Sequence, residues 1–551
     1  MLELQDLSLQ VGSEADEHFL LAETSLRLPR SHLAAILGPS GCGKSTLLKV
    51  IAGITEQTVG KVKWEGRDLS EEADLEPHEI GYVPQFSIAF ERLTVWENLA
   101  TALQLRVAGL PAELADQRIE RVLEEVGLAD IPEREVRLLS GGQRRRLALA
   151  LEILSSPHLL LCDEVTSGLD PSSEDEIVAL LRELSREESR TVLNVTHSVR
   201  NLQMHDSVLV LYRGHVAYHG APDSLLHYFG VVEADDLFPK LALRAPKEWH
   251  RSWIKHRTPY YAACGLDQEA DGHPPSLPSE EHANEPAESE SKADEAPVPP
   301  PAVEPVRLPS LVAQVFTLLG RRKKLFFRDR GQLALQVALL FGFPILVIIF
   351  ALGGLPQLPN PSGTDSQSFI AQMMSDVARR KQFIEAGTLV SGLVMFQVIL
   401  LALMGSNNSA REVAGERMIF EKEKFAGLRP AAYVMSKAIY LGVLVCAQSL
   451  WMAAFVGWFV KFPGDFAAQA ALLILVNAAM TAVCLGLSSV LKTAEQSSLV
   501  SIYLVGFQLP LSGALLALPA GLGTIARPFI ASYWSWSGFL DTMRATRLFD
   551  A

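Results

Sequence analysis

Positive charge and cysteine are both scarce in this sequence of 551 residues, and each scarcity excludes a class of protein. Asp and Glu number 63 against 49 Lys and Arg, so the formal net charge at pH 7 is -14. Nucleic-acid binders need a basic face that displaces counterions from phosphates, so we expect no nucleic-acid partner. The five cysteines are scattered without the spacing of a metal site, which favours a reduced compartment over a disulfide framework.

The first residues, MLELQDLSLQV, also lack something, namely the apolar core of a signal peptide. Polar and apolar residues alternate there as they do in a β-strand. We therefore expect the N-terminal part of the chain to stay in the cytosol.

The chain divides by composition into three parts. In residues 1–240, short apolar runs alternate with charged helical stretches, which predicts an α/β domain. Residues 241–307 lose this periodicity, and eleven acidic residues face one Lys between 266 and 306. The tail of this connecting segment, rich in Pro, Glu, Ser and Ala, cannot bury enough apolar surface to fold, so it predicts a disordered tether, with a regulated binding segment as the alternative. Residues 308–551 are much more apolar.

Charged residues are nearly absent from five long apolar runs in this last part, where Lys437 is the single exception. Each run has about 20 residues or more, enough for a helix to cross the hydrocarbon core. Buried helices of a soluble protein are the alternative, which five such runs in series argue against. We expect an all-α transmembrane domain and a multi-pass integral membrane protein. The runs are Leu333–Leu355, Ala386–Met404, Tyr433–Val460, Ala467–Leu491 and Ser497–Leu518.

Basic residues predict the orientation of these spans. The stretches 321–330 and 411–424 are rich in Lys and Arg, and the positive-inside rule places both on the cytosolic side with the first domain. The apolar segment 310–319 before the first of them predicts an amphipathic helix at the membrane surface. The sequence ARRKQ at 378–382 would face outward, against the rule. No sixth run follows, so we expect the tail from Gly521 to lie outside the membrane and the chain to be a fragment.

A Gly-rich loop between a strand and a helix predicts a phosphate-binding site. The stretch LAAILGPSGCGKSTLLKVIAG reads as strand, turn and helix. Its glycines let backbone N–H groups converge on phosphate oxygens, Lys44 reaches the β- and γ-phosphates, and Ser45 offers a hydroxyl to Mg²⁺. The residues expected to hold the nucleotide are Gly38, Pro39, Ser40, Gly41, Cys42, Gly43, Lys44, Ser45 and Thr46.

A second strand-like run, HLLLCDE, ends in the carboxylates Asp163 and Glu164. One carboxylate is needed to hold Mg²⁺, and a neighbouring one can orient or deprotonate the attacking water. Adjacent acids after a strand otherwise form a helix cap, so it is the phosphate loop that favours the catalytic interpretation. Gln85 and His197 each follow another strand-like run.

In order and approximate spacing, these motifs resemble the ATP-binding cassette ATPases, a family of P-loop NTPases with an α/β fold. LSGGQ at 139–143 and SGLD at 167–170 complete the set. The resemblance implies ATP and Mg²⁺ as cofactors. It implies that Asp163 and Ser45 bind Mg²⁺ and that Glu164 is the general base. It also implies that Gln85 contacts Mg²⁺ and the attacking water, and that His197 holds the γ-phosphate.

The resemblance further implies a dimer. In the family, two ATPase domains pair head to tail, and the SGGQ motif of one closes over the γ-phosphate held by the other. A Ser hydroxyl and Gly N–H groups at a helix N-terminus suit an anion. The partner is expected to be a second copy of the chain or a related half-transporter. The residues of this second group are Ser140, Gly141, Gly142, Gln143 and Asp170.

The domain order, ATPase first and membrane part second, resembles the G subfamily, the white or eye-pigment type. The stretch VLYRGHVAYHGAPDSLLHYFG, ending at Gly230, and residues 415–442 are similar to that subfamily. The resemblance implies an exporter of lipids, sterols or other small amphipathic compounds within a lipid membrane, with a short cytosolic helix that couples the ATPase to the spans. A membrane-anchored ATPase that transmits force to a partner is the alternative. A soluble DNA-repair ATPase would need a long coiled coil and a basic face, which the sequence lacks.

Three features depart from the family pattern. Val11, or Phe19 after a longer loop, stands where an aromatic residue usually stacks on the adenine, and Val165 replaces the Pro after the catalytic Glu. A sixth span is also missing. The sequence does not identify the substrate, although five residues of the second and fifth runs could line a central cavity, with helix packing as the alternative. These are Phe396, Gln397, Phe507, Gln508 and Leu511.

Overall fold

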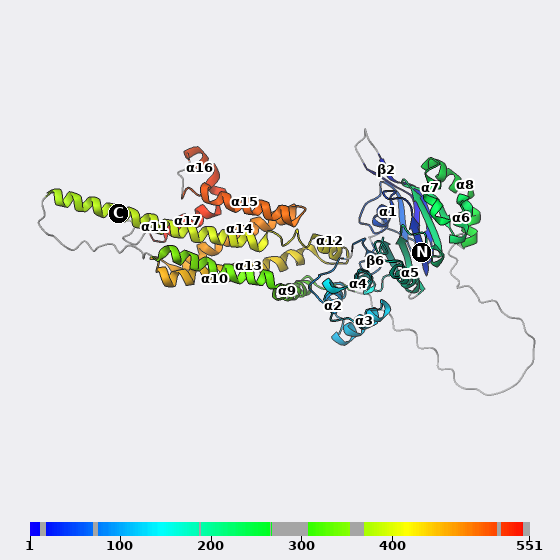
Figure 1. Ribbon diagram of the computed structural model, residues 1–551, viewed down its shortest axis with the longest axis horizontal. Coiled ribbons are helices and arrows are strands. Elements are labelled where there is room, and N and C mark those ends of the chain that lie inside the picture. The colour runs from blue at the N-terminus through cyan, green and yellow to red at the C-terminus, as the bar shows by residue number, and fades with distance from the viewer. Residues whose placement is uncertain are drawn as a thin grey trace, which may run out of the picture. The chain divides into compact units, whose positions relative to one another are not determined.

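The structure is a computed structural model of the chain, and it falls into two compact units (Figure 1). The first contains Met1–Ser310 with Phe425–Gly427, and the second contains Leu311–Lys424 with Leu428–Ala551. The predicted tether at 267–306 lies outside the described residues. The structure describes residues 1–11, 18–69, 75–86, 88–186, 189–264, 266, 307–352, 369–514 and 519–543.

The first unit is built on a ten-stranded sheet, as its alternating pattern predicts. The strands are β1 (Leu2–Val11), β2 (His18–Leu28), β3 (His32–Leu37), β4 (Val59–Trp64), β5 (Arg67–Asp68), β6 (Ile80–Val83), β7 (Leu159–Asp163), β8 (Thr191–Val195), β9 (Ser207–Tyr212) and β10 (His215–Gly220). Their order is β5-β4-β1-β2-β10-β9-β3-β8-β7-β6. The part from β9 to β6 is parallel, so β3, β7 and β6 end at one edge. In α/β sheets, ligands bind at that edge.

Helices cover both faces of this sheet. They are α1 (Lys44–Ile51), α2 (Val95–Arg106), α3 (Ala112–Glu125), α4 (Gly141–Ile153), α5 (Pro171–Arg186), α6 (Pro222–Phe229), α7 (Leu237–Leu241) and α8 (Pro246–Cys264), with short 3₁₀ turns at Val136–Leu138, Leu202–Met204 and Ala234–Asp236. One hydrophobic core includes residues of α1, α6, α7 and α8, and the other includes residues of α2 to α5. Strands β3, β7, β8 and β9 are buried throughout, which is typical of a sheet sandwiched between helices.

The first unit extends beyond residue 240, where the sequence predicts that regular structure ends. Helix α8 buries Trp249 and Trp253, which contact the sheet through Tyr218 of β10 and its neighbours. The indole Nε1 of Trp249 donates a hydrogen bond to the Leu241 carbonyl at 3.0 Å. The boundary expected at residue 240 falls short of this helix because its apolar burial rests mainly on Trp249 and Trp253, four residues apart on one face, with Tyr260 and Tyr261 packed against the same core.

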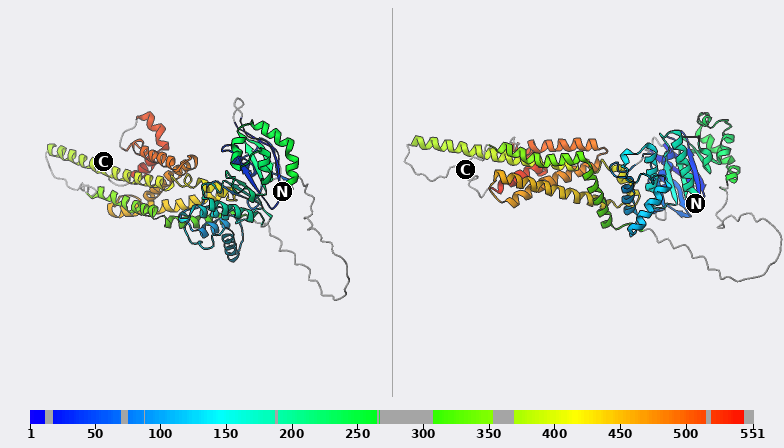
Figure 2. Two further views of the ribbon diagram at one scale, coloured as in Figure 1. Left: turned by 45° about the vertical axis from the view of Figure 1, so that its right-hand side comes forward. Right: turned by 60° about the horizontal axis from the view of Figure 1, so that its bottom comes forward.

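The second unit is helical, in agreement with the predicted membrane domain. Its helices are α9 (Leu311–Arg328), α10 (Arg330–Ala351), α11 (Phe369–Ser409), α12 (Arg417–Phe425, shared with the first unit at its last residue), α13 (Pro430–Val460), α14 (Phe466–Val490), α15 (Ala494–Leu511), α16 (Ala520–Ala526) and α17 (Ala531–Asp541), with a 3₁₀ turn at Arg527–Phe529. The long helices α10, α11, α13 and α14 run side by side (Figure 2). The predicted surface helix at 310–319 forms the first half of α9, and ARRKQ is part of α11.

Four helices of the described ranges are long and apolar enough to cross a membrane, namely α10, residues 384–409 of α11, α13 and α14. The fifth predicted span does not form one helix of that kind. Helix α15 covers it only as far as Leu511, contains Pro510, and is followed by Gly513 in a left-handed conformation with φ 79°. Glu495 in its first turn also lowers its mean hydropathy.

A buried ion network lies where α9, α12 and the start of α13 meet. The amine of Lys437 lies 2.6 Å from a carboxylate oxygen of Glu416 and 2.9 Å from one of Glu412. Glu412 also pairs with Arg322, and Arg321 forms a two-pronged pair with Glu423. The single charge inside the predicted spans, Lys437, is therefore neutralised by carboxylates, which a buried ammonium requires.

Candidate nucleotide-binding site

The predicted phosphate loop joins β3 to α1 and needs glycine at two places for steric reasons. A Cβ on Gly38 would lie 2.2 Å from the Leu211 carbonyl oxygen, and one on Gly43 would lie 2.6 Å from the Leu20 carbonyl oxygen. Gly43 is the residue before α1 and has φ 106°, which L-residues with a side chain rarely adopt. The loop is therefore pressed against neighbouring backbone, and its backbone N–H groups stand before the start of a helix, where an anion is stabilised.

Lys44 is the first residue of α1 and is 4% exposed. Its Nζ donates to the carbonyl oxygens of Gly38 and Pro39 at 2.9 and 3.1 Å, so the ammonium lies across the loop. Cys42 points into the core, where burial raises the pKa of its thiol, and its N–H donates to the Pro39 carbonyl at 3.3 Å. Ser40 is exposed at the rim of the loop. The loop thus presents backbone and one amine rather than apolar side chains.

The predicted magnesium ligands lie side by side. Ser45 Oγ donates to Asp163 Oδ1 at 2.7 Å, although the two residues are 118 positions apart. The other oxygen of Asp163 accepts a hydrogen bond of 3.2 Å from the Tyr82 hydroxyl. Burial raises the pKa of the Tyr82 hydroxyl, and the negative charge of Asp163 raises it further, so this phenol remains a hydrogen-bond donor. The hydrogen bond from Tyr82 fixes the direction in which Asp163 presents its carboxylate.

These oxygens fit Mg²⁺, because that ion prefers oxygen ligands and takes few of them from the protein. Within the described ranges, three or more His, Cys, Asp or Glu side chains nowhere gather as a metal site would require. A site made of one hydroxyl and one carboxylate, completed by phosphate oxygens and water, needs no such cluster. Ser45 and Asp163 are the residues that would hold the ion.

Glu164 follows directly and is held from two sides. Gln85 Nε2 donates to its Oε2 at 2.8 Å, and His197 Nε2 lies 2.8 Å from its Oε1. Its backbone has φ 52°, a left-handed conformation that is costly for a residue with a side chain and clusters at functional sites. The three predicted catalytic side chains thus meet, because β6, β7 and β8 are neighbours and Gln85, Glu164 and His197 each follow the end of one of these strands.

The residues of the SGGQ motif and Asp170 form no hydrogen bond to the phosphate loop among the residues that the structure describes. Ser140 caps α4, since its Oγ accepts from the Gln143 N–H at 3.3 Å and its own N–H donates to Gln143 Oε1 at 3.0 Å. Gly141 and Gly142 form the first turn of that helix. Asp170 caps α5 by accepting from the hydroxyl and the N–H of Ser173, and these bonds lower the pKa of its carboxyl.

Two functional candidates escaped the sequence reasoning. Tyr82 stands three residues before Gln85, and only the parallel pairing of β6 with β7, which sets it opposite Leu161, places it beside Asp163. Arg145 in α4 donates to the backbone carbonyl of Gln85 and, at 3.4 Å, to that of Ser167. A run of three arginines after SGGQ gave no means of telling which one turns inward.

The residues near the expected adenine position lie at the end of the β1–β2 pair. Val11 pairs with His18, and Phe19 pairs with Gln10, and both Val11 and Phe19 are about half exposed. Val165, which replaces the usual Pro, is fully buried in the second core. Phe19 and Val11 are both exposed enough to contact an adenine ring, so the identity of the adenine contact stays a prediction.

Comparisons with known proteins agree with this division into an ATPase and a membrane domain. Residues 21–167 match the family model described as ABC transporter, and residues 313–531 match the one described as ABC-2 type transporter. The chain belongs to the ABC transporter family, with an N-terminal ATPase domain and a C-terminal ABC-2 type membrane domain. It is therefore a membrane protein whose first domain is an ABC-type ATPase domain.

Individual relatives give the extent of the likeness. The chain is 31% identical over 524 residues to the ABC transporter ATP-binding/permease protein Rv1747 of Mycobacterium tuberculosis, a match that covers 90% of this chain and 52% of that protein. It thus spans about half the length of this relative. It is 36% identical over 225 residues to the methionine import ATP-binding protein MetN of Symbiobacterium thermophilum, covering 40% of this chain and 67% of that protein. A solved dimer of the ATP-binding cassette MJ0796 with ADP and phosphate aligns at 26% identity and a TM-score of 0.38, covering 40% of this chain and 99% of that one.

Proposed function

We propose that the chain is one half of a dimeric, ATP-driven exporter of a small amphipathic compound. The observation that carries the ATPase part is the carboxylate of Glu164, held at 2.8 Å by both Gln85 and His197 next to the Ser45–Asp163 pair. A base, a magnesium ligand set and a phosphate loop at one sheet edge are what phosphoryl transfer to water requires.

Each residue has a separate part in the proposed reaction. The loop N–H groups and Lys44 would hold the phosphates, and Ser45 and Asp163 would hold Mg²⁺. The ion would neutralise charge that develops on the phosphates. Glu164 accepts the proton of the attacking water at its carboxylate. Gln85 orients that carboxylate and the water, and His197 contacts the γ-phosphate.

The signature residues support a dimer. Ser140, Gly141, Gly142 and Gln143 form a capped helix N-terminus whose open face suits an anion, and Ser140 is exposed. We propose that this face, with Asp170, closes over the phosphates held by a second copy or a related half-transporter. Binding of ATP then joins two subunits and hydrolysis releases them, which makes the nucleotide the ligand of a two-state switch.

Transport, its direction and the cytosolic placement of the ATPase are supported by the membrane part. An ABC-2 type membrane domain is on the same chain as the ATPase, in the order of the G subfamily, and basic residues cluster beside α9 and α12. Relatives of the ATPase domain alone include import proteins, so export rests on the domain order. A membrane-facing, apolar domain favours a lipid-like substrate.

The test is ATPase activity of the full chain in lipid nanodiscs, with Glu164→Gln beside the wild type and a panel of lipids, sterols and amphipathic drugs. We expect turnover stimulated by one class of compound and reduced by about 10²-fold or more in Glu164→Gln, because general bases contribute that much. Glu183→Gln, the same change on the exposed face of α5, is the control and should keep full turnover.

Two results would change the proposal. Wild-type turnover in Glu164→Gln would mean that Glu164 is not the base. Glutamate-dependent turnover that no compound stimulates would favour a membrane-anchored ATPase that transmits force to a partner.

A further inference from the structure

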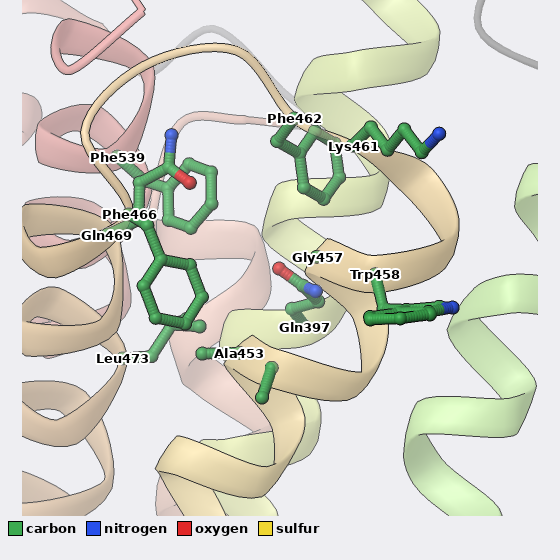
Figure 3. Close-up of a pocket in the computed structure, with 11 residues that line it drawn as sticks. Gln397, Ala453, Gly457, Trp458, Lys461, Phe462, Phe466, Gln469, Leu473 and Phe539 are labelled. Carbon is green, nitrogen blue, oxygen red and sulfur yellow. The ribbon is translucent and has the colours of Figure 1, made fainter.

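A pocket of about 460 Å³ lies in the second unit, at the end of the helix bundle where α13 turns into α14 (Figure 3). Its walls come from α11, α13, α14, α17 and the loop between α13 and α14, and they include four aromatic rings. A volume in the range of 300–1,000 Å³ and an apolar lining with a few polar groups are typical of small-molecule sites. The pocket contains Gln397 but not Phe507, Gln508 or Leu511, so it is not the central cavity that the sequence suggested.

Gln397 is the unusual member of this lining. It is 1% exposed, and its Oε1 has no hydrogen-bond partner in the part of the chain that the structure describes. In the view of Figure 3 its amide lies between the rings of Phe466 and Trp458. Buried polar atoms in native proteins nearly always have a partner, because leaving one unpaired costs stability. An unpaired oxygen that faces a pocket therefore indicates a missing hydrogen-bond donor.

The other groups around the pocket define what could bring that donor. Trp458 is 80% exposed and Phe466 is 51% exposed, so the pocket opens on an exposed apolar face of the bundle. The one charged residue of the lining, Lys461, extends away from Gln397 in Figure 3. The amide of Gln469 is already bound through its Nε2 to the Pro463 carbonyl at 2.8 Å. A ligand that enters from the membrane thus meets one free amide inside an apolar wall.

We propose that this pocket binds the hydroxyl head of a neutral, single-chain amphipath. A hydroxyl donates one hydrogen bond and accepts others, so it pairs with the Oε1 of Gln397 and with the Nε2 of the same amide. A carboxylate or an ether has no donor and leaves the oxygen unpaired. The chain of the ligand packs against Phe466 and Phe539 and leaves the pocket beside Trp458.

The volume of the pocket suits a ligand with one alkyl chain rather than two. A volume of 460 Å³ corresponds to roughly fifteen water-sized groups at about 30 Å³ each. A phospholipid with two acyl chains has far more non-hydrogen atoms than that. The site needs neither ATP nor a second subunit, so it is independent of the proposed export reaction.

The experiment is photolabelling of the full chain in nanodiscs with a long-chain primary alcohol that carries a diazirine in its chain. The matching methyl ether and fatty acid are the comparison probes, and labelled peptides are found by mass spectrometry. We expect labelling between Ala453 and Leu473 by the alcohol, with about tenfold weaker apparent affinity for the other two probes, as loss of one hydrogen bond implies.

Variants separate the amide from the cavity. Gln397→Leu removes an unpaired amide, so it should keep thermal stability and weaken alcohol binding about tenfold. Ala453→Phe fills the pocket and should abolish labelling, whereas Val443→Phe adds the same ring to an exposed position of α13 and should have no effect. If Ala453→Phe does not fold, Gly457→Leu serves instead, since a Cβ there meets only the Phe466 ring at an ordinary 3.6 Å.

Three results would overturn the proposal. They are equal labelling by the alcohol and the ether, unchanged affinity in Gln397→Leu, and labelled peptides outside the pocket walls. All three readouts are independent of ATP hydrolysis, so failure of the export reaction would leave them interpretable.

Discussion

Gln85 and Glu164 meet at the ends of two neighbouring parallel strands, where Nε2 of the amide donates to Oε2 of the carboxylate at 2.8 Å. His197 occupies the other oxygen at the same distance. A carboxylate that can rotate freely would face a water molecule only part of the time. The two contacts restrict Glu164 to one orientation, which is the condition for efficient proton transfer.

Replacement of Gln85 tests this orientation. Gln85→Ala should lower ATP turnover by about tenfold to hundredfold, because a misplaced catalytic group loses that much, while ATP affinity changes little. In a Glu164→Gln background, the same change should have no further effect, since residues that act as a unit are not additive. Turnover and nucleotide binding of the single and double variants measure both statements. A further tenfold loss in the double variant would contradict a role through Glu164.

The glycines of the phosphate loop should differ in their tolerance of a side chain. Gly38→Ala should abolish nucleotide binding, because the added Cβ would lie 2.2 Å from the Leu211 carbonyl oxygen. Gly41→Ala is the matched control: nothing lies within 4 Å of its Cβ, and only the φ of 75° is unfavourable, at about 1–2 kcal/mol. Binding of a fluorescent nucleotide and the melting temperature separate the two. Equal loss of nucleotide binding in both variants would mean that backbone strain, rather than a steric clash of the added Cβ, explains the need for glycine in the loop.

The proposed shared site predicts an effect at a distance from the phosphate loop. Ser140→Arg should block closure of the dimer and remove nearly all ATP turnover, while each subunit still binds ATP. Gln117→Arg, on the exposed face of α3, introduces the same side chain and should leave turnover intact. Turnover, nucleotide binding and ATP-dependent dimerisation are the readouts. Full activity of Ser140→Arg would argue against a site shared between subunits.

The ion network of the membrane unit should be sensitive to removal of one partner. Lys437→Met leaves the buried Glu412 and the partly buried Glu416 without their ammonium, and loss of one partner costs about 3–5 kcal/mol in other buried pairs. Adding Glu416→Gln should recover part of this loss, because Glu412 keeps its pairing with Arg322. Lys381→Met, in an exposed pair with Glu385, should change little. Thermal unfolding in detergent compares the four proteins, and a double variant no better than Lys437→Met would contradict the ion-pair explanation.

The same network sets a pH dependence. Burial alone would raise the pKa of the Glu416 carboxyl, but Lys437 and then Arg322 hold it below its ordinary value of 4.5. A depressed folded-state pKa stabilises the protein above the unfolded value, and this contribution is lost as the pH falls through the folded value. In Lys437→Met, burial is less offset and the folded-state pKa of Glu416 is higher than in the wild type, so the variant protonates this carboxyl first as the pH falls. The difference in melting temperature between the wild type and Lys437→Met should therefore be largest at neutral pH and shrink as the pH falls through that higher pKa. A difference that stays constant down to about pH 4 would exclude Glu416 as its source.

Local sequence patterns were enough to predict the strand, loop and helix around the phosphate loop and the buried strands of the sheet. The loop from Gly38 to Thr46 could be predicted because its chemistry is contiguous in sequence, and the buried strands because their apolar runs are unbroken. The roles of Tyr82 and Arg145 could not, since they depend on which strands are neighbours and on which side of α4 faces Gln85. The sequence does not distinguish Arg144, Arg145 and Arg146, because only the packing of α4 shows that Arg145 contacts the Gln85 carbonyl.

The observed architecture differs from the predicted one at helix α8 and at the fifth span, and each difference has its own cause. Helix α8 was overlooked because two tryptophans give a weak apolar pattern, yet each buries a large area. The fifth span was expected because composition alone counts apolar residues from Ser497 to Leu518. A helix also needs an unbroken backbone, and Pro510 with the left-handed Gly513 ends α15 early.

Helix α11 is longer than a membrane requires. Its 41 residues extend over about 60 Å at 1.5 Å per residue, roughly twice the hydrocarbon thickness, and only residues 384–409 qualify as a span. Lys381 lies before this span and pairs with Glu385 one turn later. The remaining residues of α11, 369–383, continue the same helix beyond the candidate span, so this span is extended by about four further helical turns.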